Sequence, residues 1–278
     1  MLASYLAPYI TGRYDVEIVP LSLPTPLVTY LLPSLWSETS LPVFLSPDGV
    51  NEATGNLVPD PGQGRQWVVV QAGQQISTGV GFGPGRKTFY EAKLEIPFLR
   101  HPSAKSSSPA TPFTYKHTIL FSSRMMALSS QHLSGLTSHR VAFDVDDATY
   151  QAEGYLSVRD ESRRREGGDA PPDETTTRGW GEDLVGSCFE GWFVGEQTGD
   201  GATRFEANPL SPPEARPSLH VRLNLPTLTS LPRDALEKLL GATDSARLDE
   251  QGWYDVERVP GWKLSVATRM QVERVDRL

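Results

Sequence analysis

Side chains that can exchange protons lie on several short segments of β-type sequence. Glu91 shares one face of an alternating segment with Lys93 and Glu95, whereas His117 and His139 belong to two further segments. A carboxyl group in an apolar interior has a raised pKa and suits proton transfer, and a neutral imidazole can polarise a carbonyl or relay a proton near pH 7. The alternative is structural: the charged residues form a solvated strand face, and the histidines are ordinary hydrogen-bonded residues of a β-protein.

Nucleophile arrangements in the sequence are weak. Ser138, His139 and Arg140 are consecutive. On an extended strand Ser138 and His139 therefore face apart, and at most one of His139 and Arg140 points inward. The GxSxG turn of many serine hydrolases is absent from the sequence. Cys188 lies in the segment GSCFEGWF, which indicates a buried strand and an inert thiol. We therefore expect neither a serine hydrolase nor a reactive cysteine.

Cofactor motifs are missing as well. The five His and the single Cys form no cluster at metal-ligand spacing, and the glycine-rich stretch GVGFGPGRK matches neither GxxxxGK[ST] nor a full GxGxxG. We expect no metal and no other cofactor. The net charge of -8 argues against a nucleic-acid partner, and a single cysteine excludes a disulfide-framed module.

Membrane and export signals are also not apparent. No segment reaches the roughly 18 to 20 apolar residues that span a bilayer. The first residues, MLASYLAPYITGRYDVEIVP, lack a positively charged start followed by an apolar run and a small-residue cleavage site. The expectation is a cytoplasmic protein with no membrane partner.

The positioning elements are predicted to be strands. The chain has 24 Gly and 23 Pro, which punctuate short runs rich in Val, Thr, Tyr and Phe. Helical patterns are confined to residues 26–36 and 232–241, and no regular alternation of strand and helix appears. The sequence therefore predicts a mainly β protein, an antiparallel barrel or sandwich with a few short helices. The expected strands are 66–72, 87–97, 114–122, 139–145, 149–158, 188–194, 218–224 and 262–272.

Two polar stretches interrupt the strand pattern. Residues 159–183 are crowded with charge, Gly, Pro and Thr and predict a long exposed loop, and the shorter stretch 103–111 predicts a hairpin loop. The segments on both sides of each stretch have the same β-type composition. The chain is therefore expected to form a single domain over residues 1–278.

From Thr88 onward, four stretches resemble the acetoacetate decarboxylase family. The first is YEAKLEIP, in which Glu91 lies five residues before an Ile-Pro pair, and the second is Tyr115-Lys-His117 with the apolar residues after it. The third is SSQHLSGLTSHRVAF, residues 129–143, which is similar to a family loop of the type GRExWGxPKxxAxF. The fourth is the strand expected at 262–272. The resemblance covers about two thirds of the chain and implies a β-barrel of the acetoacetate decarboxylase-like type.

The resemblance breaks at the residues that carry the family's chemistry. Members of the family hold a Schiff-base lysine in a closed pocket, but Thr137 and Ser138 stand where the loop's proline and lysine are expected, and the family's early arginine falls near Ser22. Serine and threonine cannot form an iminium. A rescue by Lys116 or Lys93 is the alternative, although lysines on strands are usually solvated. The chain is therefore interpreted as similar to lysine-less relatives in the specialised metabolism of filamentous fungi.

The resemblance also implies a set of pocket residues. It places Glu91, His117 and His139 around the pocket as catalytic candidates. Aromatic side chains on several elements could line an apolar cavity for a polycyclic or polyketide-sized ligand, although aromatics more often fill an ordinary core. The substrate-binding candidates are Ser138, Arg140, Tyr90, Tyr115, Trp67, Phe121 and Met126.

These observations give two functional hypotheses. The first is an enzyme of specialised metabolism that acts on an apolar carbonyl-bearing substrate without a Schiff-base lysine, most simply a cyclase or isomerase using pericyclic, Diels–Alder-type or dehydrative cyclisation. The second is a non-catalytic binding or carrier protein, and a residual decarboxylase that uses another lysine is a further alternative. The expected partner is a small molecule, and strand edges allow a homo-oligomer. A lysine ammonium deep in the main cavity would overturn the lysine-less interpretation.

Overall fold

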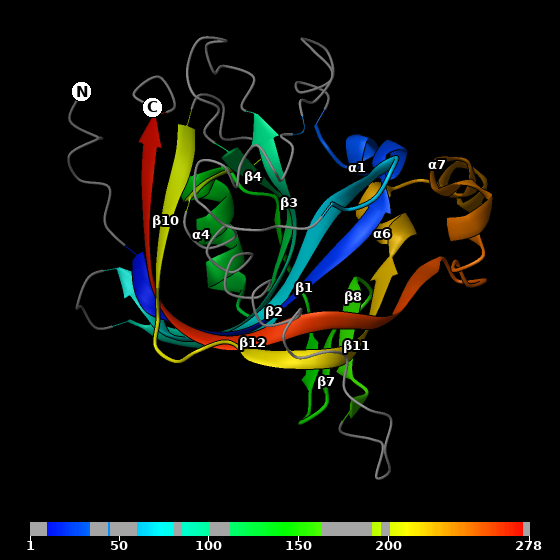
Figure 1. Ribbon diagram of the computed structural model, residues 1–278. Helices are drawn as coiled ribbons and strands as arrows, with labels where there is room; N and C mark the ends of the chain where they lie inside the picture. The colour runs from blue at the N-terminus through cyan, green and yellow to red at the C-terminus, as the bar shows by residue number, and fades with distance from the viewer. Residues whose placement is uncertain are drawn as a thin grey trace.

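One long, curled sheet dominates the computed structural model, which describes residues 10–33, 44, 60–80, 85–100, 112–162, 191–195 and 201–274. Neighbouring strands follow the order β1-β2-β3-β4-β9-β10-β12, and β1 also pairs with β12, so these strands form a ring. Figure 1 shows the curl, with β10 and the end of β12 standing opposite β3 and β4. The ring strands are β1 (Ile10–Pro24), β2 (Arg65–Val80), β3 (Lys87–Arg100), β4 (Pro112–Phe121), β9 (Gly191–Val194), β10 (Gly201–Pro209) and β12 (Trp253–Arg274).

The remaining strands extend or edge this ring. Beyond β12 the sheet continues through β11 (Glu214–Asn224), β8 (Leu156–Asp160), β7 (Thr149–Ala152) and β6 (Phe143–Val145), and β5 (Ser138–Arg140) pairs with β4. Most pairs are antiparallel, but β4 pairs in parallel with both β5 and β9. The predicted class, a mainly β barrel with few helices, is confirmed.

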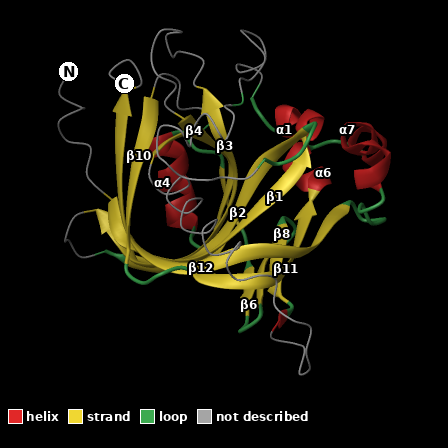
Figure 2. Ribbon diagram, in the orientation of Figure 1, coloured by secondary structure: helices red, strands yellow, loops and turns green. Residues whose placement is uncertain are grey.

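Helices occupy two places. Three of them, α1 (Thr25–Tyr30), α6 (Leu225–Thr229) and α7 (Arg233–Ser245), gather at one end, whereas α4 (Arg124–Ser134) lies within the curl of the sheet (Figure 2). The expected helix at 26–36 stops at Tyr30, and the one at 232–241 extends to Ser245 past a kink at Gly241, where φ is 73°. The sequence predicted a loop, not a helix, where α4 lies.

Several strand predictions need correction. β1 and β10 were not predicted, although Tyr14, Val16 and Ile18 alternate with polar residues along β1. The strand expected at 139–145 is split into β5 and β6, and the one at 149–158 is a β7–β8 hairpin. Residues 159–160 belong to β8, so the exposed loop predicted at 159–183 cannot begin there. Residues 103–111, 163–183 and Cys188 lie outside the described residues, and the single domain stays a prediction.

Two apolar clusters hold the sheet together, one on each of its faces. The larger cluster contains Leu94 and Ile96 of β3 and packs them against β7, β8, β11 and the helices α1, α6 and α7. The smaller cluster lies inside the ring and contains Tyr14, Ile119 and Phe193. β3 therefore has buried residues on both of its faces, which the alternating sequence pattern did not predict.

Candidate active site

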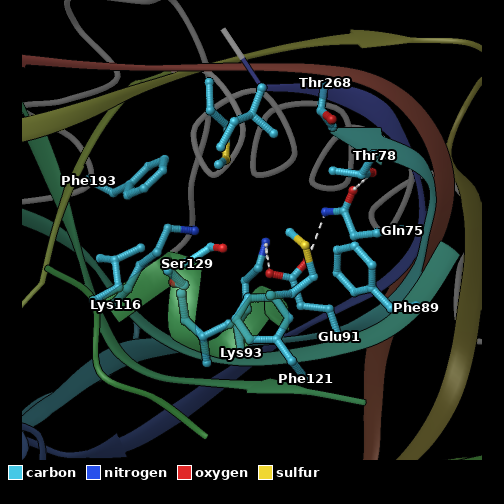
Figure 3. Close-up of a pocket in the computed structure, with 16 residues that line it drawn as sticks. Gln75, Thr78, Phe89, Glu91, Lys93, Lys116, Phe121, Ser129, Phe193 and Thr268 are labelled. Carbon is cyan, nitrogen blue, oxygen red and sulfur yellow. Dashed lines mark hydrogen bonds and ion pairs between the residues drawn. The ribbon is translucent and has the colours of Figure 1, made fainter. Parts of the chain in front are cut away.

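A cavity opens inside the ring, between the strands and α4. Its volume is about 60 Å3, room for a few water molecules or a small organic ligand. Most of the wall is apolar, and the polar groups come mainly from β2, β3, β4 and α4 (Figure 3). The lining residues are Ile10, Gln75, Thr78, Phe89, Glu91, Lys93, Lys116, Ile119, Phe121, Met126, Ser129, Ser130, Leu136, Phe193, Thr268 and Met270.

Charged side chains from adjacent strands are buried at this cavity. The exposed fraction is 5% for Glu91, 3% for Lys93, 1% for Glu95 and 6% for Lys116. In Figure 3 the amino groups of Lys93 and Lys116 point into the open centre of the view. The expectation that strand lysines are solvated is wrong for these two residues, because the ring closes around the faces of β3 and β4 that carry them. Lysine is missing at position 138, but it is present in the cavity.

Glu91 and Lys93 belong to the first of two polar chains. The Lys93 Nζ lies 3.3 Å from the Glu91 Oε1 and 4.7 Å from the centre of the Tyr14 ring. The amide of Gln75 donates to the Glu91 Oε2 at 2.8 Å, and the Thr78 hydroxyl donates to the Gln75 Oε1 at 3.0 Å. This chain holds the carboxylate of Glu91 in a fixed place on the cavity wall.

Lys116 and Glu95 form the second chain. The Lys116 Nζ donates to the Glu95 Oε1 at 2.5 Å and lies 4.0 Å from the centre of the Phe193 ring, and the amide of Gln71 donates to the Glu95 Oε2 at 2.8 Å. Burial lowers the pKa of Lys116 below its usual value, Glu95 opposes the shift, and the positive charge of Lys93 adds to it. A lysine with a lowered pKa has a larger fraction of its side chain as the neutral amine, which is the form needed for nucleophilic attack.

A β-bulge at His117 decides which side chain of β4 faces the cavity. Leu94 of β3 pairs with Thr118, but the next residue, Glu95, pairs with Lys116, so His117 is an extra residue on β4. Without it, alternation from Phe121 and Ile119 would turn residue 117 inward and residue 116 outward. The bulge reverses that order and directs Lys116 into the cavity.

Neither predicted catalytic histidine lines the cavity. The Nε2 of His117 is buried without a hydrogen-bond partner in the described part of the chain, and burial, with a smaller effect of His139, lowers the pKa of His117 to about 4. His139 is exposed and stacks on Tyr155 with 5.6 Å between ring centres. His117 therefore lies away from the cavity because of the bulge, and His139 because β5 is at the sheet edge.

Some of the predicted binding residues line the cavity and the others do not. Phe121 and Met126 line the cavity, and Phe121 packs edge-on against Phe89 at 5.7 Å. Ser138 is buried, but its hydroxyl lies 3.1 Å from the carbonyl oxygens of Ala127 and Leu136, so it anchors α4. The others do not line the cavity.

These remaining residues serve packing or face outward. Tyr90 packs against Phe143 and Tyr150, and Tyr115 belongs to the larger apolar cluster. Trp67 is buried on β2 and Arg140 is exposed.

Tyr150 fixes the backbone that carries Glu91. Its hydroxyl donates to the carbonyl of Gly73 and accepts from the N–H of Glu91 at 3.1 Å. Burial raises the pKa of Tyr150, which keeps the hydroxyl protonated. Gly73 itself is close to β1, since a Cβ there would lie 2.1 Å from the Asp15 carbonyl oxygen. Only glycine permits this approach.

The sequence contained a signal for one of the two lysines. Glu91 and Lys93 are two residues apart on a strand, so a Glu91 that faces the barrel interior requires Lys93 to face it too. The inward direction of Lys116 had no such signal, because a bulge without Gly or Pro leaves no mark in the sequence pattern.

The described residues also bear on ligands and membranes. No three His, Cys, Asp or Glu side chains among them come together in a way that could hold a metal ion. In the same part of the chain, no helix has the length and apolar character needed to cross a bilayer.

Comparisons with known proteins find similarity only among solved structures. No family model and no curated protein matches the chain. The enduracididine biosynthesis enzyme MppR complexed with pyruvate is 12% identical, with a TM-score of 0.45 over 96% of this chain and 90% of that one. An acetoacetate decarboxylase is 10% identical, with a TM-score of 0.44 over 96% and 88%. An acetoacetate decarboxylase-like enzyme from Sphingomonas wittichii RW1 is 13% identical, with a TM-score of 0.44 over 96% and 93%. At these values the similarities assign no residue and no reaction to this chain.

Proposed function

We propose that this protein is a small-molecule enzyme in which the amine of Lys116 attacks the carbonyl group of a substrate bound in the cavity. The observation that carries the proposal is the buried Lys116 side chain with its lowered pKa on an otherwise mainly apolar wall. The lysine-less mechanism expected from position 138 is replaced by one that uses a different lysine.

The proposed step needs no cofactor. The neutral amine of Lys116 forms a bond to the carbonyl carbon as the carbonyl π bond breaks, and the oxygen takes up one proton from solvent. A second proton passes to that oxygen from the amine nitrogen, and the oxygen then leaves as water to give an iminium on Lys116. The positive nitrogen lies where the ammonium lay beside Glu95, so the existing carboxylate stabilises it.

Neighbouring residues supply the acid–base steps. The iminium draws electrons from the adjacent carbon, so a proton on that carbon becomes more acidic. We assign its removal and return to the carboxylate of Glu91, which Gln75 orients on the cavity wall. The Lys93 ammonium, 3.3 Å from Glu91, is placed to donate to a substrate oxygen. Isomerisation and dehydration, including dehydrative cyclisation, follow from such an intermediate. Decarboxylation is the alternative, and it requires a substrate that carries a carboxylate.

A second candidate keeps the expected lysine-independent cyclase or isomerase. Its support is that each cavity lysine contacts a glutamate, at 3.3 Å for Lys93 and 2.5 Å for Lys116. Two ammonium groups held in this way could polarise a carbonyl by hydrogen bonding alone while the apolar wall folds the substrate. We propose specialised metabolism as the biological role of such an enzyme. A non-catalytic carrier protein would differ from it by binding the same small molecule without turnover.

Borohydride trapping separates these candidates. The protein is incubated with a small ketone such as butanone, reduced, digested and analysed by peptide mass. Imine chemistry predicts one stable adduct on Lys116. Lys116→Met combined with Glu95→Gln, which removes both charges of the pair, is expected to abolish it, and Lys87→Met on the exposed end of β3 is the matched control. Absence of any adduct, or an adduct confined to exposed lysines, would contradict the imine mechanism and favour the second candidate.

A further inference from the structure

The charges around the cavity bear on which carbonyl compounds can enter it. Resting on the imine function proposed above, we infer that the cavity selects uncharged carbonyl compounds over carboxylates of the same shape. The inference depends on the pairing of the buried charges and on the charge of the site at the moment of attack.

Each cavity ammonium already has a carboxylate beside it. Lys93 lies 3.3 Å from Glu91 and Lys116 lies 2.5 Å from Glu95, and all four residues are at most 6% exposed. None of the described lining residues is an arginine. A carboxylate that entered would have to share an ammonium with a glutamate, and an incompletely paired charge in an apolar wall is unfavourable.

The net charge of the buried groups becomes negative when Lys116 loses its proton and becomes reactive. Attack requires the neutral amine, and the neutral amine leaves Glu95 without its positive partner, so the charged groups Glu91, Lys93 and Glu95 then sum to one negative charge. A substrate carboxylate would raise this to two, whereas an uncharged substrate leaves it at one. Formation of the iminium from an uncharged substrate then restores the positive charge beside Glu95.

The remaining polar groups of the wall are uncharged. They are the amide of Gln75 and the hydroxyls of Thr78, Ser129, Ser130 and Thr268. Figure 3 shows Gln75, Thr78 and Thr268 on the side of the cavity opposite Lys116. Amides and hydroxyls suit hydroxyl, amide or carbonyl oxygens at the far end of a substrate. The substrate class is therefore an uncharged aldehyde or ketone with a further neutral oxygen or amide group.

A matched pair of probes tests this inference. Pyruvamide and pyruvate share size and ketone, and they differ in the charge of one group. Each is incubated with the protein and cyanoborohydride, and the rate of adduct formation on Lys116 is divided by the rate with free N-acetyl-lysine. We expect pyruvamide to be favoured by about tenfold or more, since like charges in a buried site repel strongly. Glu95→Gln should reduce this preference several-fold, and Glu257→Gln, on the exposed surface of β12, should leave it unchanged.

The outcomes of this experiment separate the selectivity for uncharged substrates from the imine function on which it rests. Equal or faster trapping of pyruvate overturns the selectivity and leaves the imine function standing. Trapping of neither probe overturns the imine function, and with it this inference. A preference for pyruvamide that persists unchanged in Glu95→Gln also overturns it, because the preference would then not come from the charge pair.

Discussion

The two faces of β3 are both buried, yet they meet opposite surroundings. Ala92, Leu94 and Ile96 are at most 1% exposed and pack into the larger apolar cluster. On the other face, Glu91, Lys93 and Glu95 are at most 5% exposed. Glu91 and Lys93 line the cavity, and Glu95 pairs with the cavity residue Lys116. Alternation of polar and apolar residues therefore indicates that a strand has two faces, but the polar face is not always in water.

The difference separates stability from chemistry. Burial of the apolar face is favourable by about 25 cal/mol per Å2 of apolar area removed from water. Buried ion pairs are weak evidence for stability, since desolvation offsets most of their attraction. We interpret the apolar face as the structural half of β3 and the charged face as its functional half. Substitutions on each face test that division.

The largest expected effect is on reaction rate and comes from the charged face. Lys116→Met with Glu95→Gln removes the nucleophile and its counter-charge together, so imine formation should fall by about 1,000-fold or more. Because both buried charges disappear together, we expect thermal unfolding to change little. The check is the trapping rate alongside a melting curve. An active double variant would show that another group carries the reaction.

Removing only one charge of the pair should affect stability instead. Glu95→Leu leaves the Lys116 ammonium buried without that partner, and we expect a loss of about 3 to 5 kcal/mol in unfolding free energy near neutral pH. The pKa of Lys116 should fall further. The unfolded chain then binds more protons than the folded one, so stability should rise with pH between the lowered pKa and 10.5. Denaturant unfolding from pH 6 to 10 tests both parts, and a stability independent of pH would contradict them.

A change on the apolar face should lower the stability and leave the rate of imine formation nearly unchanged. Leu94→Ala removes a fully buried side chain from the larger cluster and should lower the unfolding free energy by about 2 to 4 kcal/mol. The rate of imine formation at a temperature where the variant remains folded should stay within about threefold of the parent. A rate loss as large as that of the lysine variant would break the division between the two faces.

The smallest effect concerns the residue at the bulge. His117 has a pKa of about 4 in the folded protein against 6.5 for an ordinary histidine, so stability should be lost as pH falls through this range, by up to about 3 kcal/mol. His117→Phe should flatten that pH dependence and leave imine trapping unchanged. If trapping falls sharply in a folded His117→Phe protein, His117 belongs to the site after all.

The sequence was sufficient for the fold class and for part of the site. Alternation predicted β2, β3 and β4, and it predicted that Glu91 shares a face with Lys93. It could not predict that the ring closes around that face, because closure depends on β1 pairing with β12 more than 200 residues away, as in Ile18 with Trp262. Long-range pairing leaves no local signal in the chain.

The structure places His117 away from the cavity for a local reason. One extra residue on β4 exchanges the directions of Lys116 and His117. Side-chain period alone cannot detect this shift, since the segment TYKHTILF reads equally well with or without a bulge. Ser138 was expected to bind substrate, but the structure directs its hydroxyl to the carbonyl oxygens of Ala127 and Leu136, because α4 lies against it.

The most direct test of the account is the pKa of Lys116 itself. The chain has only six lysines, at positions 87, 93, 105, 116, 238 and 263, so an NMR titration of protein labelled at the lysine side chain can be assigned by single substitutions. We predict that the Lys116 resonance titrates clearly below 10.5 and that it disappears in the Lys116→Met, Glu95→Gln protein. A Lys116 resonance that titrates at or above 10.5 would contradict the account.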